Sequence, residues 1–128
     1  MRQVTAAVII ELDRLFVARR GPEGALPGYW ELPGGKLEVG ETIQECLARE
    51  LQEELGMQSH VGDIIATTTY HYVHGSFEML ALEATRCSDF TLRVHDAVSW
   101  ASRDEIGELL LAPADVELIA EIIATGRW

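Results

Sequence analysis

A run of charged residues with regular spacing lies between Gly35 and Met57, and its residue types suit metal-ion chemistry. Here the chain reads Gly-x5-Glu-x7-Arg-Glu-Leu-x-Glu-Glu-x-Gly-Met, where x is any residue. Three carboxylates, Glu50, Glu53 and Glu54, are spaced i, i+3 and i+4 and would share one face of a helix. Carboxylates crowded in this way repel one another unless a cation lies between them, and hard oxygen ligands select Mg²⁺ or Mn²⁺. The pattern therefore predicts a divalent-metal site.

Without the residues around them, the same three acids would be weaker evidence for a metal site. An isolated Glu-x-x-Glu-Glu on a helix is usually a solvated surface, because charged side chains stay in water. Here they are accompanied by Gly34 and Gly35, by Arg49 and by Gly56 at a defined spacing. This joint pattern favours the metal site over the solvated surface.

Composition is typical of a single enzyme domain. The chain has 128 residues, of which 48% are hydrophobic, and we expect one domain spanning residues 1–128. It has no run of about 18 apolar residues and no pattern of a secretory leader, so we expect a cytoplasmic protein without a membrane partner. The two cysteines, Cys46 and Cys87, form neither a disulfide framework nor a metal-ligand spacing, and we expect both to be reduced, buried thiols.

The negative net charge of the chain limits the classes of molecule that it can bind. A net charge of −11 argues against binding to a nucleic-acid polymer, which needs a basic surface to displace counterions. It does not exclude a nucleotide as substrate, because a divalent metal would neutralise part of the acidic cluster before an anion arrives. Six of the 21 acids lie between residues 38 and 54, close to the predicted metal site.

Strands are predicted from apolar runs and alternating patterns. The first, Val4–Ile10, is apolar at nearly every position and predicts a strand that is buried on both faces. The others are Leu15–Ala18, Trp30–Leu32, Val61–Tyr72, Phe77–Ala84 and Ala97–Ala101, with a turn at Glu11–Arg14 and a hairpin turn at His74-Gly75. The segment Gly21–Tyr29 is rich in glycine and proline and is expected to be an irregular binding loop.

The first predicted helix carries the three acids. Thr42 and Glu45 form a capping box at its start, and Gly56 is a helix-ending glycine. Apolar residues recur at helical spacing opposite the acidic face, at Ile43, Leu47, Leu51 and Leu55. We therefore expect a helix that buries one face and exposes the carboxylates on the other.

Two further helices are predicted near the C-terminus. Ser102 and Glu105 form a second capping box, before a short helix that ends near Leu111. Pro113 begins the last helix, whose expected buried face consists of Val116, Ile119, Ala120 and Ile123. Strands and helices are mixed without strict alternation, so the predicted class is α+β, a mixed sheet in a sandwich with helices.

These residues resemble the signature of the Nudix hydrolases. The longer run Trp30–Glu38 is similar to the MutT-type branch, as are the pair Arg19-Arg20 and the segment Leu111–Asp115. The last segment is most similar to the CTP pyrophosphohydrolase subgroup, and the chain as a whole resembles the CTP pyrophosphohydrolase or 8-oxo-dGTP diphosphatase type. The resemblance implies an α/β/α sandwich around a mixed central sheet, in agreement with the predicted elements.

The resemblance also implies roles for the residues of the box. Metal ligands would be Glu50, Glu53 and Glu54, joined by the backbone carbonyl of Gly34. Either Glu53 or Glu54 would accept a proton or bridge metals, and the spacing does not distinguish them. Arg49 and Glu41 would pair with each other or with the metal-binding carboxylates, and so hold the loop against the helix.

The implied reaction is metal-assisted hydrolysis of a nucleoside triphosphate. Bound Mg²⁺ or Mn²⁺ would neutralise phosphate charge, orient the phosphate chain and lower the pKa of a bound water. Members of this branch direct that water at the β-phosphorus and release a nucleoside monophosphate and pyrophosphate. Alternatives are a nucleoside-diphosphate-sugar or ADP-ribose hydrolase, and a nucleotide-sensing module without catalysis. The protein could be a monomer or a homodimer.

Arg20 matches a position that contacts substrate phosphate in the family. Neighbouring strand residues point to opposite faces, so only one of Arg19 and Arg20 can face a cleft, and we expect it to be Arg20. One feature departs from the family pattern. MutT-type enzymes place an acid just before a tryptophan that corresponds to Trp100, whereas this chain has Ser99 there.

The departure leaves the general base open. His95 and Asp96 are the nearest ionisable residues, and either could supply the base from this segment. Imidazole has a suitable pKa for a general base, and a carboxylate suits a metal. The segment could also be entirely structural. The remaining histidines, His60, His71 and His74, have no ligand spacing and are expected to be incidental.

Asp115 is the candidate for base recognition. In the first turn of the last helix an acid is already favoured by the helix dipole, which is its structural explanation. The sharper hypothesis follows from the resemblance, in which the corresponding residue reads the base. An ionised carboxylate only accepts hydrogen bonds, which matches the exocyclic amine of cytosine. This predicts a preference for CTP, dCTP or 5-modified forms, with oxidised dGTP second; aromatic residues available for stacking are Tyr29, Trp30, Tyr70 and Tyr72.

Overall fold

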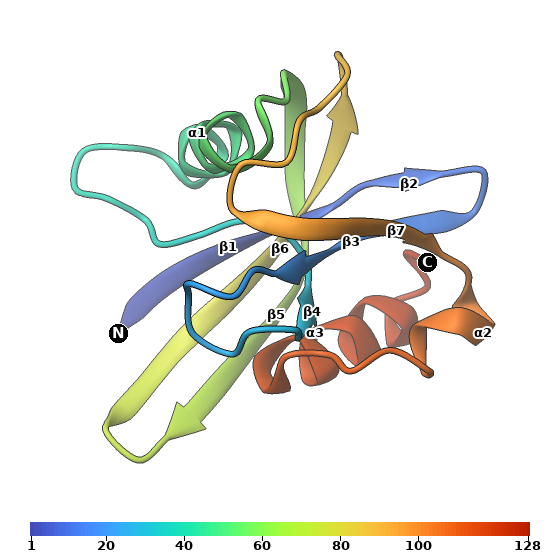
Figure 1. Ribbon diagram of the computed structural model, residues 1–128. Helices are drawn as coiled ribbons and strands as arrows, with labels where there is room; N and C mark the ends of the chain where they lie inside the picture. The colour runs from blue at the N-terminus through green and yellow to red at the C-terminus, as the bar shows by residue number, and fades with distance from the viewer.

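Seven strands and three helices make up the fold, which the computed structural model describes for residues 1–128 (Figure 1). The strands are β1 (Arg2–Val8), β2 (Ile10–Glu11), β3 (Arg14–Arg20), β4 (Trp30–Glu31), β5 (Ser59–Tyr72), β6 (Gly75–Arg86) and β7 (His95–Ala101). The helices are α1 (Ile43–Leu55), α2 (Arg103–Ile106) and α3 (Pro113–Ala124). None of the helices is both long and apolar enough to cross a membrane.

The strands form two sheets. In the first, β1 runs parallel to β6 and β5 runs antiparallel to it, in the order β1-β6-β5. In the second, β3 pairs antiparallel with β2, β4 and β7. Helix α1 lies on one side of the sheets and α3 on the other (Figure 1). The predicted class, α+β with a mixed sheet between helices, is confirmed.

Each main helix covers its own hydrophobic cluster, and alternate residues of β1 contribute to opposite clusters. Ala7 packs in the cluster beneath α1, with Leu47, Leu51 and Leu55 of that helix. Ala6 and Val8 pack in the cluster beneath α3, whose buried residues are Leu118, Ile119 and Ile122. This two-sided burial explains why the N-terminal strand is apolar at nearly every position.

The predicted strand Val4–Ile10 is continuous in sequence but divided in the structure. The pairing with β6 ends at Val8, and Ile10 pairs instead with Leu15 of β3. The chain therefore passes from the first sheet to the second at Ile9. The predicted turns are present: Leu12 and Asp13 adopt the positive φ angles of a tight hairpin turn, and β5 and β6 are joined at Val73-His74.

Helix α1 begins and ends where its capping residues predict. Both hydrogen bonds of the capping box between Thr42 and Glu45 are formed. At the other end Gly56 is left-handed, with φ 58°, and its N–H donates to Gln52 and Leu51 carbonyls. The acidic residues consequently lie on a helix whose ends are well defined.

Two predictions about the C-terminal helices are wrong. Helix α2 ends at Ile106 rather than near Leu111, because Trp30 donates its N–H to Leu110 O at 2.8 Å and draws that segment into an extended bridge with β4. In α3 the predicted buried face is displaced by one residue. Val116 is 51% exposed, whereas the residues that are buried are Asp115, Leu118, Ile119 and Ile122. A pattern based on apolar residues cannot anticipate a buried carboxylate.

The two cysteines differ in burial. Cys46 is fully buried in α1, and burial raises the pKa of its thiol. Cys87 is exposed, which contradicts the expectation of two buried thiols, because it lies just beyond the end of β6.

Candidate metal and nucleotide site

A cavity of about 1060 Å³ opens between the two sheets and α3. Its size is typical of a small-molecule site. Segments from seven parts of the chain line it: the start of β1, the loop after Arg20, Glu31-Leu32, the Gly34–Lys36 loop, the β5–β6 hairpin, residues 93–96 and the start of α3. The predicted binding loop and Gly34 therefore meet Arg20 and Asp115 around one cavity.

The three acids of α1 are not equivalent in the structure. The side chains of Glu50 and Glu54 are only 15% and 16% exposed, whereas Glu53 is 59% exposed. The pKa of Glu54 is raised to about 9, mainly by burial and also by a hydrogen bond with Glu50 and by the charges of Glu31 and Glu50. Glu54 Oε1 is buried without a hydrogen-bond partner. A buried carboxylate oxygen beside other carboxylates is a ligand that a divalent cation would satisfy, although no group of three or more Asp, Glu, His or Cys side chains converges on one metal position in this structure.

The Gly34-Gly35 pair lets the loop approach α1 closely. A Cβ atom on Gly34 would collide with the backbone of Thr5, and one on Gly35 would collide with the Glu50 carboxylate. The Gly35 carbonyl accepts a hydrogen bond from Thr5 N at 2.8 Å, which fixes the loop on β1. The glycines are therefore required by contact with β1 on one side and with Glu50 on the other.

Arg49 connects the loop to the acidic face. Its guanidinium forms a bidentate pair with Glu41, at 2.8 and 3.1 Å, and donates to Lys36 O at 3.2 Å. It also donates to Glu50 at 2.9 Å and to Glu53 at 3.2 Å. The Arg49 hydrogen bonds lower the pKa of Glu41 to about 2. The structure thus contains both pairings that the resemblance allowed, and Arg49 binds the loop and two of the metal-ligand candidates together.

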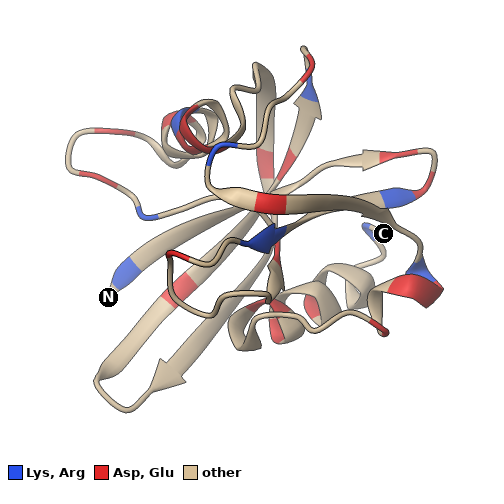
Figure 2. Ribbon diagram, viewed as in Figure 1, with Lys and Arg blue, Asp and Glu red and all other residues tan.

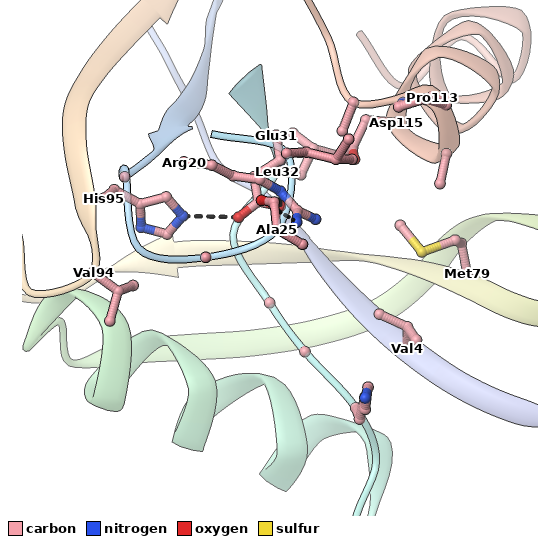
Figure 3. A pocket seen from close by; sticks show the side chains of 18 of the residues that line it. Val4, Arg20, Ala25, Glu31, Leu32, Met79, Val94, His95, Pro113 and Asp115 are labelled. Carbon is pink, nitrogen blue, oxygen red and sulfur yellow. Dashed lines mark hydrogen bonds and ion pairs between the residues drawn. The ribbon is translucent and has the colours of Figure 1, made fainter. Parts of the chain in front are cut away.

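A second polar cluster lines the cavity and centres on Glu31 (Figure 3). Arg20 Nε donates to Glu31 Oε1 at 2.8 Å, and His95 Nε2 lies 2.8 Å from Glu31 Oε2. The His95 side chain is 2% exposed, and its Nε2 is 3.9 Å from Glu54 Oε1. Glu31 therefore links the substrate-binding candidate Arg20 to the carboxylates of α1.

Asp115 enters the same cavity from α3 (Figure 3). It is 4% exposed, and its Oδ1 accepts a hydrogen bond from Leu32 N at 2.9 Å. The pKa of Asp115 is raised to about 7, mainly by burial and also by the nearby Glu31, while the Leu32 N–H and Arg20 oppose the increase. Asp115 is thus a buried carboxyl group that titrates near neutrality, rather than a solvent-exposed acid at a helix terminus.

Several candidates lie elsewhere or have other partners. Arg19 pairs with Asp96 at 2.7 Å on the half-exposed surface, whereas Arg20 lines the cavity as expected from strand alternation. Among the aromatic candidates, Tyr70 and Tyr72 line the cavity, while Tyr29 and Trp30 do not. His60, His71 and His74 are exposed and outside it.

Sequence reasoning missed Glu31 as a site residue. Its only signal was a charged residue inside the short predicted strand Trp30–Leu32. The apolar walls of the cavity, which include Val4 and Met79, also came from strands interpreted simply as core. The contacts of Glu31 with Arg20 and His95 span 11 and 64 residues of sequence, which no local pattern reports.

The fold and this site define a Nudix hydrolase. The family described as "NUDIX domain" matches residues 1–124, and the chain belongs to this family as a MutT-like hydrolase. The CTP pyrophosphohydrolase of Escherichia coli is 36% identical, with 97% of this chain and 93% of that protein covered. An 8-oxo-dGTP diphosphatase of Proteus vulgaris is 37% identical over 70 residues, which covers 54% of this chain and 62% of the relative.

Solved structures agree with the family assignment. The solution structure of the E. coli ORF135 protein has a TM-score of 0.86 and 31% sequence identity, and the match covers 97% of this chain and 89% of that one. The protein is therefore an enzyme of the Nudix class, and its substrate has to be inferred from the site.

Proposed function

We propose that this protein is a Mg²⁺-dependent nucleoside-triphosphate pyrophosphohydrolase, with Mn²⁺ as the alternative metal. It hydrolyses CTP, dCTP or a 5-modified form to the nucleoside monophosphate and pyrophosphate. The observation that carries the proposal is one cavity with two chemically different ends. Gly34 and Gly35 line the cavity beside the metal-ligand carboxylates of α1, which adjoin it, and the buried Asp115 enters it from α3. Glu31 lies between the two, close enough to raise the pKa of both Glu54 and Asp115.

Glu50 and Glu54 are the proposed core of the metal site, with Glu53 and the Gly34 carbonyl completing it. A bound divalent ion supplies charge neutralisation for the phosphates and a water of lowered pKa. The partnerless oxygen of Glu54 supports its assignment as a ligand. Glu53 lies at the solvent side beside Arg49, which suits the residue that exchanges a proton with the attacking water.

We assign Arg49 and Glu41 to positioning the loop and the carboxylates, not to the chemical step. Their bidentate pair and the Arg49 bond to Lys36 O hold the loop that carries Gly34 against α1. Positioning matters because a displacement of about 1 Å in a catalytic group can cost about 100-fold in rate. We assign His95 to orienting Glu31, since its Nε2 is already hydrogen-bonded there.

Asp115 is proposed to read the base. Its Oδ1 is occupied by Leu32 N, which leaves Oδ2 for the exocyclic amine of cytosine. Leu32, Val4 and Met79 provide apolar surface around it, and Tyr70 offers a ring for stacking. The similarity to the CTP pyrophosphohydrolase of E. coli supports this substrate.

Oxidised dGTP is the second candidate, and the ionisation of Asp115 is the observation that favours it. Because its pKa is about 7, a fraction of Asp115 is protonated at neutral pH and can donate as well as accept. A carboxyl group that does both can pair with the edge of an oxidised guanine. The 8-oxo-dGTP diphosphatase of P. vulgaris supports this alternative.

A substrate panel tests the proposal. CTP, dCTP, 8-oxo-dGTP, a nucleoside-diphosphate sugar and ADP-ribose are each incubated with enzyme and Mg²⁺, and pyrophosphate and phosphate are measured separately. We expect pyrophosphate from the triphosphates, with a cytidine nucleotide turned over fastest. Faster cleavage of ADP-ribose or of the sugar derivative would refute the assignment, and no turnover of any compound would favour a nucleotide sensor.

A further inference from the structure

Arg20 is the arginine of β3 that lines the cavity, and its side-chain contacts lead towards Asp115. Its Nε donates to Glu31 Oε1 at 2.8 Å, and its Nη1 donates to Ala25 O at 3.1 Å. None of its side-chain hydrogen bonds or ion pairs reaches a carboxylate of α1. The end of β3, which Figure 2 shows as a basic segment, is therefore joined to β4 and to the loop that follows β3.

Arg20 and Asp115 are anchored to consecutive residues of the chain. The Glu31 carboxylate accepts from Arg20 Nε, and the Leu32 N–H donates to Asp115 Oδ1 at 2.9 Å. Neighbouring Cα atoms are about 3.8 Å apart, so the two side chains are held over one region of the cavity that both line. The charge of Arg20 accordingly opposes the rise in the pKa of Asp115. A ligand group that binds Asp115 Oδ2 therefore lies within reach of Arg20.

The Arg20 guanidinium has hydrogen-bond donors without partners. A guanidinium carries five N–H groups and no acceptor. Glu31 and Ala25 accept from Nε and Nη1, and the N–H groups of Nη2 have no partner in the protein. The side chain is 31% exposed, so part of the guanidinium remains open to the cavity (Figure 3). Arg20 is thus held in place by two hydrogen bonds and can still donate to a ligand.

The charges around Arg20 disfavour a phosphate at this point. Glu31 already pairs with the guanidinium, and Asp115 is close enough to sense its charge. A phosphate that approached Arg20 would also approach these two carboxyl groups and be repelled by them. The neutral edge of a nucleobase meets no such repulsion. The surroundings therefore favour a contact with the base, although the corresponding family position contacts phosphate.

The hydrogen-bonding edge of cytosine matches Asp115 and Arg20 together. The exocyclic amine on C4 of cytosine donates, and the adjacent ring nitrogen N3 accepts. Asp115 Oδ2 can accept from the amine while Arg20 Nη2 donates to N3. Uracil reverses both groups, because its O4 would face the carboxylate and its N3–H would face the guanidinium. Unmatched polar groups are costly in a site from which water is excluded, so the pair would reject uracil.

We propose that Arg20 is a base-reading residue that donates a hydrogen bond to N3 of a cytosine whose amine is bound by Asp115. The inference rests on the proposed function and adds the residue that distinguishes cytidine from uridine nucleotides. Glu31 is the positioning residue for this contact. One of its oxygens accepts from Arg20 and the other is bonded to His95, which fixes the carboxylate and the guanidinium it holds.

Binding of nucleosides tests the inference without phosphate and without turnover. NMR titration compares cytidine with 3-deazacytidine, in which a C–H group replaces N3, for the wild type, Arg20→Met and Arg19→Met. We expect the wild type to bind cytidine roughly tenfold more tightly, as for a hydrogen bond to a charged group, and Arg20→Met to bind both nucleosides alike. Arg19→Met is the matched control and should keep the difference, since Arg19 pairs with Asp96 on the half-exposed surface.

Two results of the titration would overturn the proposal. One is equal binding of the two nucleosides by the wild type, which decides the question even if Arg20→Met does not fold. The other is a preference for cytidine that persists in a folded Arg20→Met.

Turnover then distinguishes this inference from the proposed function. Arg20→Met should lower kcat/KM for CTP by roughly tenfold, leave kcat/KM for UTP within about threefold, and leave inhibition by inorganic triphosphate unchanged. Equal losses for CTP and UTP, with weaker inhibition by triphosphate, would identify a phosphate contact and refute base reading. A wild type that distinguishes the nucleosides but does not cleave CTP would refute the proposed function and support the role of Arg20. A wild type that cleaves CTP but binds both nucleosides alike would refute the inference alone.

Discussion

The two ends of the cavity are built in opposite ways. At the metal end, nearly all the contacts lie within residues 34–54, where the loop and α1 are joined by Arg49. At the base end, Asp115 comes from α3, and Glu31 and His95, which lie between it and the metal end, come from β4 and β7. Their contacts span up to 83 residues. The metal end is also more open to solvent, since Glu53 is 59% exposed while Asp115 is 4% exposed.

This difference indicates a division of tasks. A local, partly hydrated group of carboxylates can accept a strongly hydrated metal ion and exchange protons with water. A buried and distant assembly is better suited to selection of the base, because an unmatched polar group costs most where water is excluded. Substitutions at the metal end should therefore affect kcat, and those at the base end should affect the ranking of substrates.

The largest effect is expected for the α1 acids. Glu53→Gln and Glu54→Gln should each reduce kcat by about 10³-fold, because each removes a proposed ligand or proton acceptor. Glu54→Gln should not lower Tm, since the raised pKa of Glu54 means that burial of its ionised form is unfavourable and an amide removes that cost. Pyrophosphate assays and thermal unfolding check both. Wild-type activity in Glu53→Gln and Glu54→Gln would contradict the metal end as described.

A smaller loss of activity is expected when the loop that carries Gly34 is no longer held against α1. Arg49→Gln should lower kcat by about 100-fold, with a smaller change in KM for CTP, because the variant misplaces the loop and the carboxylates. The pH dependence of stability gives an independent measurement. The low pKa of Glu41 stabilises the fold above about pH 4.5, and this contribution is lost as pH falls towards 2. Acid unfolding of Arg49→Gln should therefore begin at a higher pH than that of the wild type; coincident transitions would argue against the pairing.

Asp115 should control selectivity more than rate. Asp115→Asn should change the ranking of CTP and 8-oxo-dGTP by about tenfold with a small change in kcat for the better substrate. In the wild type, KM for CTP should decrease as pH rises through about 7, because the ionised carboxylate accepts from the cytosine amine. This dependence should be absent in Asp115→Asn. An unchanged substrate ranking would exclude base recognition by this residue.

Stability offers a second measurement at Asp115. Its raised pKa means that the folded state is favoured at pH values below the ordinary value of 3.8, and that this advantage is lost as pH rises through about 7. Compared with Asp115→Asn, the wild type should therefore lose Tm between about pH 4 and pH 7. Parallel Tm curves would show that Asp115 keeps an ordinary pKa.

The smallest effect is expected at His95. His95→Gln can still donate to Glu31 and should retain activity within about threefold, whereas His95→Ala leaves Glu31 without that partner and should alter the CTP preference several-fold. A catalytic base at His95 would instead make both variants nearly inactive. The comparison of the two variants thus separates a positioning role from a reacting one.

Most of the metal end could be predicted from sequence because its determinants are local. The spacing of Glu50, Glu53 and Glu54 on one helix turn, the capping pair Thr42–Glu45 and the helix-ending Gly56 all act within a few residues. Even there, the solvent exposure of each acid could not be predicted, because the three acids have the same residue type and lie on one helix face. Packing of the Gly34-Gly35 loop buries Glu50 and Glu54 and leaves Glu53 in solvent.

The base end shows why the remainder could not be predicted. Asp115 was recognised as a candidate, but its burial was hidden by the apolar pattern of α3, which suggested Val116 as the buried residue. The extended bridge between Trp30 and Leu111 ends α2 early and fixes the start of α3 against β4. That contact joins segments about 80 residues apart, so no local rule encodes it.

By itself, the sequence determined the family, the helix that carries the carboxylates and the preference of those carboxylates for a hard cation, since all three depend on residue type and short-range spacing. Only the tertiary structure decided which carboxyl groups leave water. By bringing Glu31, His95 and Asp115 together, it buried ionisable groups in surroundings of low polarity, where the pKa of a carboxyl group is shifted and an unpaired polar atom is costly.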